Sequence, residues 1–247
     1  MRIAALYDIH GNLPALEAVL LELKSERVDR IVIGGDVIPG PMPRECLDAV
    51  FALDVPTRFI IGNGDRESVA ANRGTMSSII PAFFREAMEW NGKQLSAEDE
   101  KIIAAWPLVE RITVDGIGDV VFCHATPRND TEIFLSTTDA SKLTPIFDPL
   151  NASLVVCGHT HMQFDRQVGR TRVVNAGSLG MPFQKPGAYW LLIGPGVELR
   201  RTEYDLQQAA GRVRATGYPL ADDFATKILS GADEAETTAK FAAAELK

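Results

Sequence analysis

The sequence lacks an excess of positive charge. Its 247 residues contain 25 Lys and Arg against 33 Asp and Glu, which gives a formal net charge of −8. Proteins that bind duplex nucleic acid neutralise backbone phosphates with clustered Lys and Arg, so this composition argues against nucleic-acid binding as the main function. A small anionic substrate stays compatible with it, provided that bound cations reverse the sign of the charge inside a cleft.

Long apolar runs are also missing, and cysteines are few. No apolar stretch approaches the ~18 residues that a membrane-spanning helix needs, and the first residues lead into a strand-like run without the pattern of a signal peptide. The three cysteines (Cys46, Cys123 and Cys157) are odd in number and far apart, so they do not indicate a disulfide framework. These absences predict a cytoplasmic protein with no membrane partner.

Short β-rich runs alternate with helical patterns in the first part of the chain. Strand–helix–strand alternation is typical of a parallel sheet with right-handed crossovers. We expect a single domain over residues 1–247, with a helical cap-like insertion at about 66–110 and a C-terminal helical segment at about 205–247. The expected strands lie at 2–7, 30–35, 57–62, 111–114, 119–123 and 153–157, with short strands within 163–203, and the expected helices at 13–26, 43–53 and 139–147.

All four histidines follow apolar strands. His10 comes after the first predicted strand, His124 follows Val120–Cys123, and His159 and His161 follow Leu154–Cys157. In α/β sheets, ligands bind at the carboxyl ends of the strands. A lone histidine after a strand is usually only a polar loop residue, but that explanation would have to hold separately at each of these strand ends.

Carboxylate and amide side chains stand at comparable positions. Asp8 precedes His10 by two residues, Asp36 follows the second predicted strand, and Asn63 follows the third. A spacing of two residues directs both side chains of an extended segment to the same side. Imidazole and carboxylate together suit Mn, Fe, Zn and similar divalent ions. Two such ions about 3.5–4 Å apart can clamp a phosphate, so the pattern predicts a dinuclear metal site that binds a small phosphoester.

The ordered motifs resemble those of the calcineurin-like metallophosphoesterase superfamily. They are Asp8-x-His10, Gly35-Asp36, Gly62-Asn63-x-Asp65, His124 and Gly158-His159-x-His161. The strings at 8–12 and 175–180 are similar to those of its small bacterial and archaeal phosphodiesterase branch. The resemblance implies an α/β fold, a four-layer sandwich of two mixed β-sheets flanked by helices, with the metal site at the C-terminal strand ends.

The same resemblance implies a metal-ligand set and a reaction. One ion would be held by Asp8, His10, Asp36 and His161, and the other by Asp36, Asn63, His124 and His159, so that Asp36 bridges the two. The implied cofactors are two divalent ions, with Mn favoured and Fe, Zn, Ni or Mg as alternatives. The implied reaction is attack of a metal-bridging hydroxide on a phosphate ester. Asn175 and Ser178 are expected to build the turn beneath the site and to orient ligands.

One position departs from the family pattern. Where the family has the His of its Gly-Asn-His-Asp motif, which protonates the leaving group, this chain has Gly64. Asp65, which would orient that His, is free to cap the following helix or to hold Arg66. Loss of a general acid typically costs ~10²–10⁴-fold for poor leaving groups, so we expect a preference for small-molecule phosphodiesters or activated esters.

Some assignments stay open in the sequence. Arg66, Arg73 and Arg128 follow motif positions and could grip a substrate phosphate, although surface arginines are common; Arg66 and Arg128 are the preferred candidates. A binding scaffold that keeps the fold with little activity is an alternative function. A protein Ser/Thr phosphatase is a weaker alternative, because no Asp-Arg-Gly follows Asp36.

Two helical segments also allow more than one interpretation. In the insertion, Phe83, Phe84, Met88 and Trp90 could line a nucleoside-sized slot or form a core of their own helices. The C-terminal segment could dimerise, pack on the sheet or shade the cleft. The sequence does not indicate an oligomeric state.

Overall fold

The computed structural model describes residues 1–246 and contains two five-stranded sheets. The strand order is β10-β9-β1-β2-β3 in the first sheet and β4-β5-β6-β8-β7 in the second. The strands are β1 (Ile3–Leu6), β2 (Arg30–Ile33), β3 (Thr57–Phe59), β4 (Val109–Val114), β5 (Gly118–Cys123), β6 (Leu154–Cys157), β7 (Phe164–Val168), β8 (Thr171–Asn175), β9 (Ala188–Ile193) and β10 (Val197–Thr202).

Both sheets are mixed, with parallel strands beside antiparallel ones. In the first sheet β1 pairs in parallel with β2, and β2 with β3, while β9 and β10 add an antiparallel edge. In the second sheet β5, β6 and β8 run parallel, with β4 and β7 antiparallel at the two edges. The strands that precede the predicted ligands are therefore the parallel ones, and their carboxyl ends lie together at one edge of each sheet.

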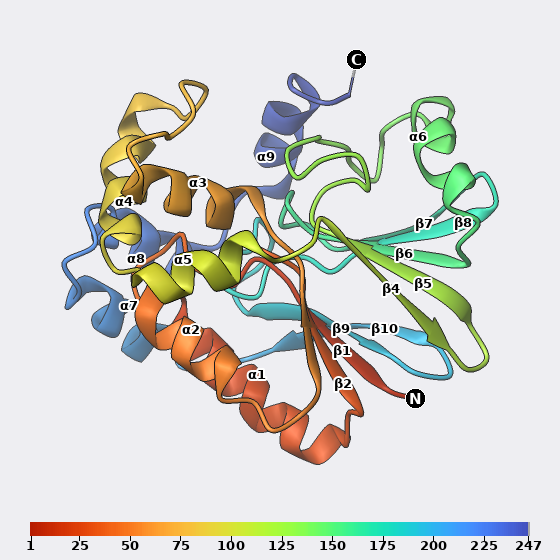
Figure 1. Ribbon diagram of the computed structural model, residues 1–247, viewed down its shortest axis with the longest axis horizontal. Helices are drawn as coiled ribbons and strands as arrows, with labels where there is room; N and C mark the ends of the chain where they lie inside the picture. Colours follow the sequence, from red (N-terminus) through yellow and green to blue (C-terminus); the bar gives the residue numbers. More distant parts are fainter. Residues whose placement is uncertain (247) are drawn as a thin grey trace.

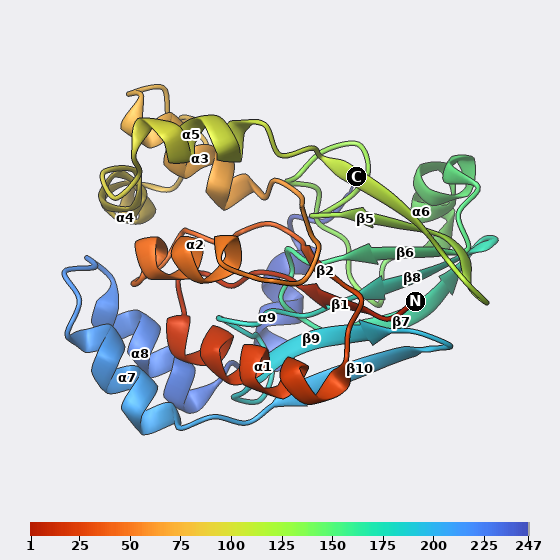
Figure 2. The ribbon, with the colours of Figure 1, turned by 60° about the horizontal axis from the view of Figure 1, so that its bottom comes forward.

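Helices cover the outer faces of both sheets (Figures 1 and 2). Helices α1 and α2 share an apolar cluster with β1 and β2, and α6 shares another with β5 and β6. A third cluster fills the space between the sheets, which confirms the expected four-layer α/β sandwich. The helices are α1 (Leu13–Glu26), α2 (Pro43–Phe51), α3 (Asn63–Asn72), α4 (Ala82–Gly92), α5 (Ala97–Ala104), α6 (Ala140–Phe147), α7 (Leu206–Arg214), α8 (Ala221–Ser230) and α9 (Glu234–Ala242).

Tyr7 connects the two sheets beside the strand ends. It follows β1, is fully buried, and its hydroxyl donates a hydrogen bond to the Val156 carbonyl oxygen of β6 at 3.1 Å. Its ring fills a slot between two glycines: a Cβ at Gly34 would lie 2.1 Å from the ring, and one at Gly158 would lie 2.6 Å away. Because both strand ends approach the ring this closely, the ligands that follow β1 and β6 come together.

The segment 66–110 contains most of α3, together with α4 and α5, which form one lobe beside the strand ends (Figure 1). Its aromatic residues do not share one environment. Phe83 is 66% exposed, whereas Trp90 packs edge-on against Tyr218 of the C-terminal segment, with ring centroids 5.5 Å apart. A core among the insertion's own helices, one of the two alternatives, is therefore wrong for Phe83. The reason is that the apolar face of α4, with Ala87 and Trp90, packs toward α7 and α8 and leaves Phe83 exposed.

The C-terminal segment divides into two parts. Helices α7 and α8 pack against each other around Val213, Phe224 and Ile228. Helix α9 lies apart from them, beside the loop that carries His161. The ring centroid of Phe241 lies 5.8 Å from that of Phe183, and the Phe183 ring stacks on His161 with centroids 4.6 Å apart. The segment thus borders the predicted metal site. Within residues 1–246, no helix is both long and apolar enough to cross a membrane.

The contact between Tyr7 and Val156 generates a stability prediction. We expect Tyr7→Phe to lower the free energy of unfolding by ~1–2 kcal/mol, because a buried carbonyl loses its donor. Tyr189→Phe is the control: its hydroxyl donates to the carbonyl of the exposed residue Lys185, in a partly buried contact where water can replace it. Urea unfolding followed by circular dichroism measures both variants, and equal losses would contradict the prediction.

Candidate metal centre

The structure brings all seven predicted ligands to one place. Asp8 and His10 follow β1, Asp36 follows β2, and Asn63 is the first residue of α3 after β3. From the second sheet, His124 follows β5, and His159 and His161 follow β6. Five of these side chains belong to residues that are at most 7% exposed, whereas Asn63 and His159 are partly exposed. The site is therefore a buried cluster that opens on the side of Asn63 and His159.

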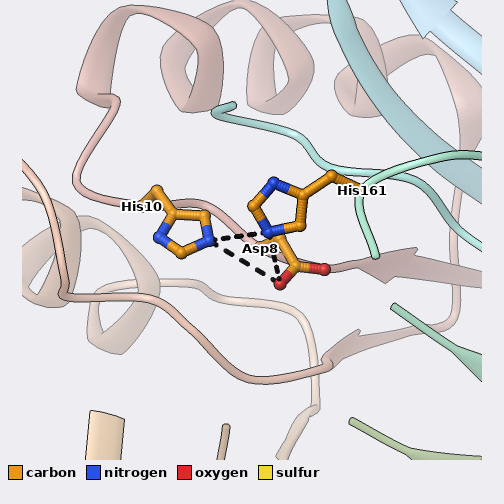
Figure 3. Close-up of side chains that lie close together, drawn as sticks. All are labelled: Asp8, His10 and His161. Atoms are coloured by element: carbon orange, nitrogen blue, oxygen red, sulfur yellow. Dashed lines mark hydrogen bonds and ion pairs between the residues drawn. The ribbon is translucent and has the colours of Figure 1, made fainter. Parts of the chain in front are cut away.

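Asp8, His10 and His161 form the first group of potential ligands (Figure 3). The Nε2 atoms of His10 and His161 lie 3.0 Å apart. Asp8 Oδ1 lies 3.3 Å from His161 Nε2 and 3.7 Å from His10 Nε2. This carboxylate oxygen is buried and has no hydrogen-bond donor among the described residues.

Backbone carbonyls determine which nitrogen of each imidazole faces the group. His10 Nδ1 lies 3.0 Å from the Pro39 oxygen, and His161 Nδ1 lies 2.7 Å from the Met181 oxygen. A carbonyl oxygen only accepts hydrogen bonds, so Nδ1 carries the proton, and Nε2 of the neutral ring presents a lone pair. Two lone pairs and one carboxylate oxygen then point at the same space. Such a donor set fits a divalent cation.

Asp36 and His124 form the second group, together with Asp8. Asp36 Oδ2 lies 3.7 Å from His124 Nε2 and also 3.7 Å from His10 Nε2. The Nδ1 atom of His124 lies 2.9 Å from the Gly34 carbonyl oxygen, so its Nε2 also faces the site. Since Asp8 Oδ1 is 3.9 Å from His124 Nε2, both carboxylates reach both groups. The bridging role of Asp36 stays a prediction.

Asn63 and His159 complete the second group on its open side. One amide atom of Asn63 lies 3.1 Å from His124 Nε2 and 2.9 Å from His159 Nδ1. With nitrogen in that position, the amide also donates to the Asp130 carbonyl at 3.2 Å. With oxygen there, the amide presents a third potential metal-ligating atom beside the two imidazoles. The choice between the two orientations is an assignment. In both cases the amide lies between His124, His159 and Asp130.

The backbone around the site is strained. Asp8, His10, Asp36, His159 and His161 all have positive φ angles, between 49° and 66°. Among the described non-glycine residues only Arg27 and Asn151 share this conformation. Such strain costs ~1–3 kcal/mol per residue and concentrates at functional sites. It turns successive side chains of each loop toward the cluster.

Burial and charged neighbours shift the pKa values of the histidines in the cluster. Burial lowers the pKa of His10, but the neighbouring carboxylates of Asp8 and Asp36 outweigh this effect and raise it overall. The pKa of His124 is raised in the same way by Asp36 and Asp8 against its burial. Burial and the nearby His124 lower the pKa of His159 to about 4. The two carboxylates thus attract positive charge to the centre of the cluster.

Asp65 holds the loop that carries Asp36. Its carboxylate accepts hydrogen bonds from the backbone N–H groups of Asp36, Val37 and Ile38 at 2.7, 2.9 and 3.3 Å. It also accepts from the Gly62 N–H at 3.1 Å, at the start of α3. Burial and the neighbouring Asp36 raise the pKa of Asp65 to about 7. Of the two roles left open by the sequence, Asp65 caps the helix, and it does not hold Arg66.

Gly64 lies against Pro39, which occupies the space that a side chain would need. A Cβ at position 64 would lie 2.3 Å from Pro39 Cγ and 3.0 Å from Asp36 Oδ1. The Gly64 N–H donates to Asp36 Oδ1 at 2.7 Å. At the position where the family motif has a histidine, a proline thus fills the space that the side chain would need.

The three arginines singled out in the sequence are all paired with carboxylates. Arg66 binds Asp130 and Glu67, Arg73 binds Glu100, and Arg128 binds Glu132. Contact of Arg66 or Arg128 with a substrate stays a prediction, and for Arg66 two buried carboxylates already use the guanidinium.

Residues beneath the cluster hold its backbone. Ser178 Oγ donates to the Asp8 carbonyl at 2.8 Å, and Asn175 Nδ2 donates to the Gly158 carbonyl at 2.7 Å, as their predicted place beneath the site requires. Sequence reasoning missed Asp130 and the carbonyls of Gly34, Pro39 and Met181. A backbone carbonyl has no signature in the sequence, and Asp130 stands in a loop without a motif.

Comparison with known proteins gives consistent matches. The family model of the calcineurin-like phosphoesterase superfamily domain matches residues 1–193. An uncharacterized protein of Methanocaldococcus jannaschii is 26% identical over 238 residues, which cover 85% of this chain and 91% of that protein.

Two solved structures are similar over nearly their full lengths. A metallophosphoesterase from Sphaerobacter thermophilus is 28% identical, with a TM-score of 0.71 over 94% of this chain and 100% of that one. A hypothetical protein from Pyrococcus horikoshii shares the fold at 22% identity, with a TM-score of 0.77 over 94% of this chain and 99% of that one. With the family model matching most of the chain and the ligand cluster in place, this protein belongs to the calcineurin-like phosphoesterase superfamily.

Proposed function

We propose that this protein hydrolyses small-molecule phosphodiesters with the help of two divalent metal ions, Mn²⁺ being the favoured ion. Membership of the family supports metal-dependent phosphoester hydrolysis in general. The observation that carries the proposal is the convergence of Asp8 Oδ1 with the Nε2 atoms of His10 and His161. When Nδ1 of each imidazole carries the proton, none of these three atoms receives a hydrogen bond from the described residues, so each offers a lone pair to a cation.

Each part of the cluster has a chemical task in this proposal. Divalent ions bound there would supply Lewis acidity toward phosphate oxygens and would lower the pKa of water. Asp8 and Asp36 offset the charge of the ions, and the Gly34, Pro39 and Met181 carbonyls keep the imidazoles in the binding tautomer. Partial exposure of Asn63 and His159 leaves the phosphate an approach from that side.

The preference for diesters and activated esters follows from position 64. No side chain extends from Gly64 toward the leaving group, and Pro39 fills the adjacent space. Esters whose leaving group departs without prior protonation lose the least from this arrangement. We further propose that α3, α4 and α5 cap the bound substrate. We also propose a cytoplasmic location, with which three unpaired, buried cysteines are compatible.

Metal dependence is the direct test of the proposal. We expect chelator-stripped protein to be inactive toward bis-p-nitrophenyl phosphate and Mn²⁺ to restore turnover. Asp36→Asn should reduce the restored rate at least ~100-fold, because it removes a carboxylate that faces both ligand groups. Asp115→Asn is the control, at a side chain that is 96% exposed in a distant turn. Bound Mn²⁺ without turnover of any diester would favour the scaffold alternative.

Position 64 gives a second prediction. Gly64→His alone should destabilise the protein by ~1–3 kcal/mol, because the new side chain collides with Pro39. Combined with Pro39→Ala, it should recover stability and raise turnover of diesters with poor leaving groups toward the ~10²-fold that a proton donor contributes. Rates over a series of aryl diesters measure this effect. An unchanged dependence on leaving-group pKa in the double variant would contradict it.

Arg128 is the arginine best able to change partners. Its side chain is 53% exposed, and within residues 1–246 it forms one ion pair, with Glu132 four residues away in the same loop. Such surface pairs contribute ~0.2–1 kcal/mol, so a phosphate can replace the carboxylate. We expect Arg128→Ala to raise KM for the diester about tenfold, with a smaller change in kcat. Arg170→Ala, at an exposed arginine paired with Asp148, should leave KM unchanged; the same KM in both variants would exclude the contact.

A further inference from the structure

The first turn of α3 meets the loop after β5 at the open side of the cluster. Asn63 and Arg66 are three residues apart on α3, so their side chains lie on the same face of the helix. Both contact Asp130. The Asn63 amide lies 3.2 Å from the Asp130 carbonyl oxygen, and Arg66 binds the Asp130 carboxylate.

The bond between Arg66 and Asp130 is bidentate. Arg66 Nε donates to Asp130 Oδ2 at 2.7 Å, and Arg66 Nη2 donates to Asp130 Oδ1 at 3.0 Å. Arg66 Nη1 donates to Glu67 Oε1 at 2.5 Å, and Glu67 in turn accepts from the Ser77 N–H at 2.9 Å. A forked contact of this kind restricts both the distance and the relative orientation of the two segments that it joins.

Burial and charge argue that this arginine is committed to the protein. The Asp130 and Glu67 side chains are only 7% and 5% exposed. Removing the arginine would leave two buried carboxylates without their cation, which is costly. The group of one arginine and two carboxylates carries a formal charge of −1, so it does not attract a phosphate.

The bridge lies next to the second ligand group. His124 precedes Asp130 by six residues in the chain, and its Nε2 faces the Asn63 amide at 3.1 Å. Arg66 therefore joins the segment that carries Asn63 to the loop that begins at His124. A change in this bridge alters the separation of those two ligands, whereas Asp8, His10 and His161 are held by other contacts.

We propose that Arg66 is a positioning residue: its bidentate bridge to Asp130 sets the geometry of the cation site formed by Asn63, His124 and His159. This inference rests on the proposed dinuclear function. It assigns Arg66 a role different from gripping the substrate, and it makes Asp130 the second member of the device.

The experiment is titration of the full-length, chelator-stripped protein with Mn²⁺ by isothermal calorimetry. Wild-type protein should bind two equivalents. In Arg66→Lys, which keeps the charge but loses the forked contact, one equivalent should bind ~10–100-fold more weakly, as is typical when a group that orients metal ligands is changed. The other equivalent should keep its affinity. Asp130→Asn should produce the same selective loss, and the two changes combined should be less than additive.

Arg44→Lys is the matched control. Arg44 also binds two carboxylates, Asp48 and the mostly buried Asp99, and it joins α2 to α5 away from the ligands. The Arg44→Lys variant should bind both Mn²⁺ equivalents with the same affinities as the wild-type protein. Thermal unfolding of all variants separates a general loss of stability from a selective loss of one site.

The possible results are distinct. If Arg66→Lys and Asp130→Asn bind both equivalents like the wild type, the inference is wrong, and a rise in KM alone would then identify Arg66 as a substrate contact. Equal weakening of both equivalents would also overturn it. A wild-type protein that binds fewer than two ions would instead refute the dinuclear function.

Discussion

A buried carboxylate without enough hydrogen bonds is the constraint on which the site depends. Asp8 is fully buried, one of its oxygens accepts from the His159 N–H at 2.9 Å, and the other has no donor among the described residues. A buried charge is tolerated only when it is paired or coordinates a metal. The three imidazole nitrogens around Asp8 present lone pairs, so a cation satisfies them and the carboxylate together.

The rest of the fold holds this unfavourable cluster in place. The parallel strands deliver the ligands to one edge, the Tyr7 ring joins the two sheets below them, and Asp65 secures the Asp36 loop. The left-handed backbone at five ligand positions would relax without these contacts. Packing and hydrogen bonds elsewhere in the fold thus offset the unfavourable free energy of the cluster. Binding of cations there would stabilise the folded protein.

The residues beside the cluster differ in how much space and freedom they have. Position 64 presents no side chain, and Pro39 fills the space that one would need. The arginines show a similar division. Arg66 is held by two buried carboxylates, whereas Arg128 is itself 53% exposed and pairs with one partly exposed carboxylate, Glu132.

Much of the fold and the identity of the ligand cluster could be predicted from the sequence. Apolar runs and helical periodicity are local, and each ligand follows a strand directly, so α1 begins and ends where its pattern does, and the ligands of both sheets meet. The sequence did not reveal the carbonyls that orient the imidazoles, the collision of Pro39 with position 64, or the bridge from Arg66 to Asp130. These depend on residues 20 to 90 positions apart in the chain or on backbone groups that every residue has, and only tertiary packing decides which of them meet.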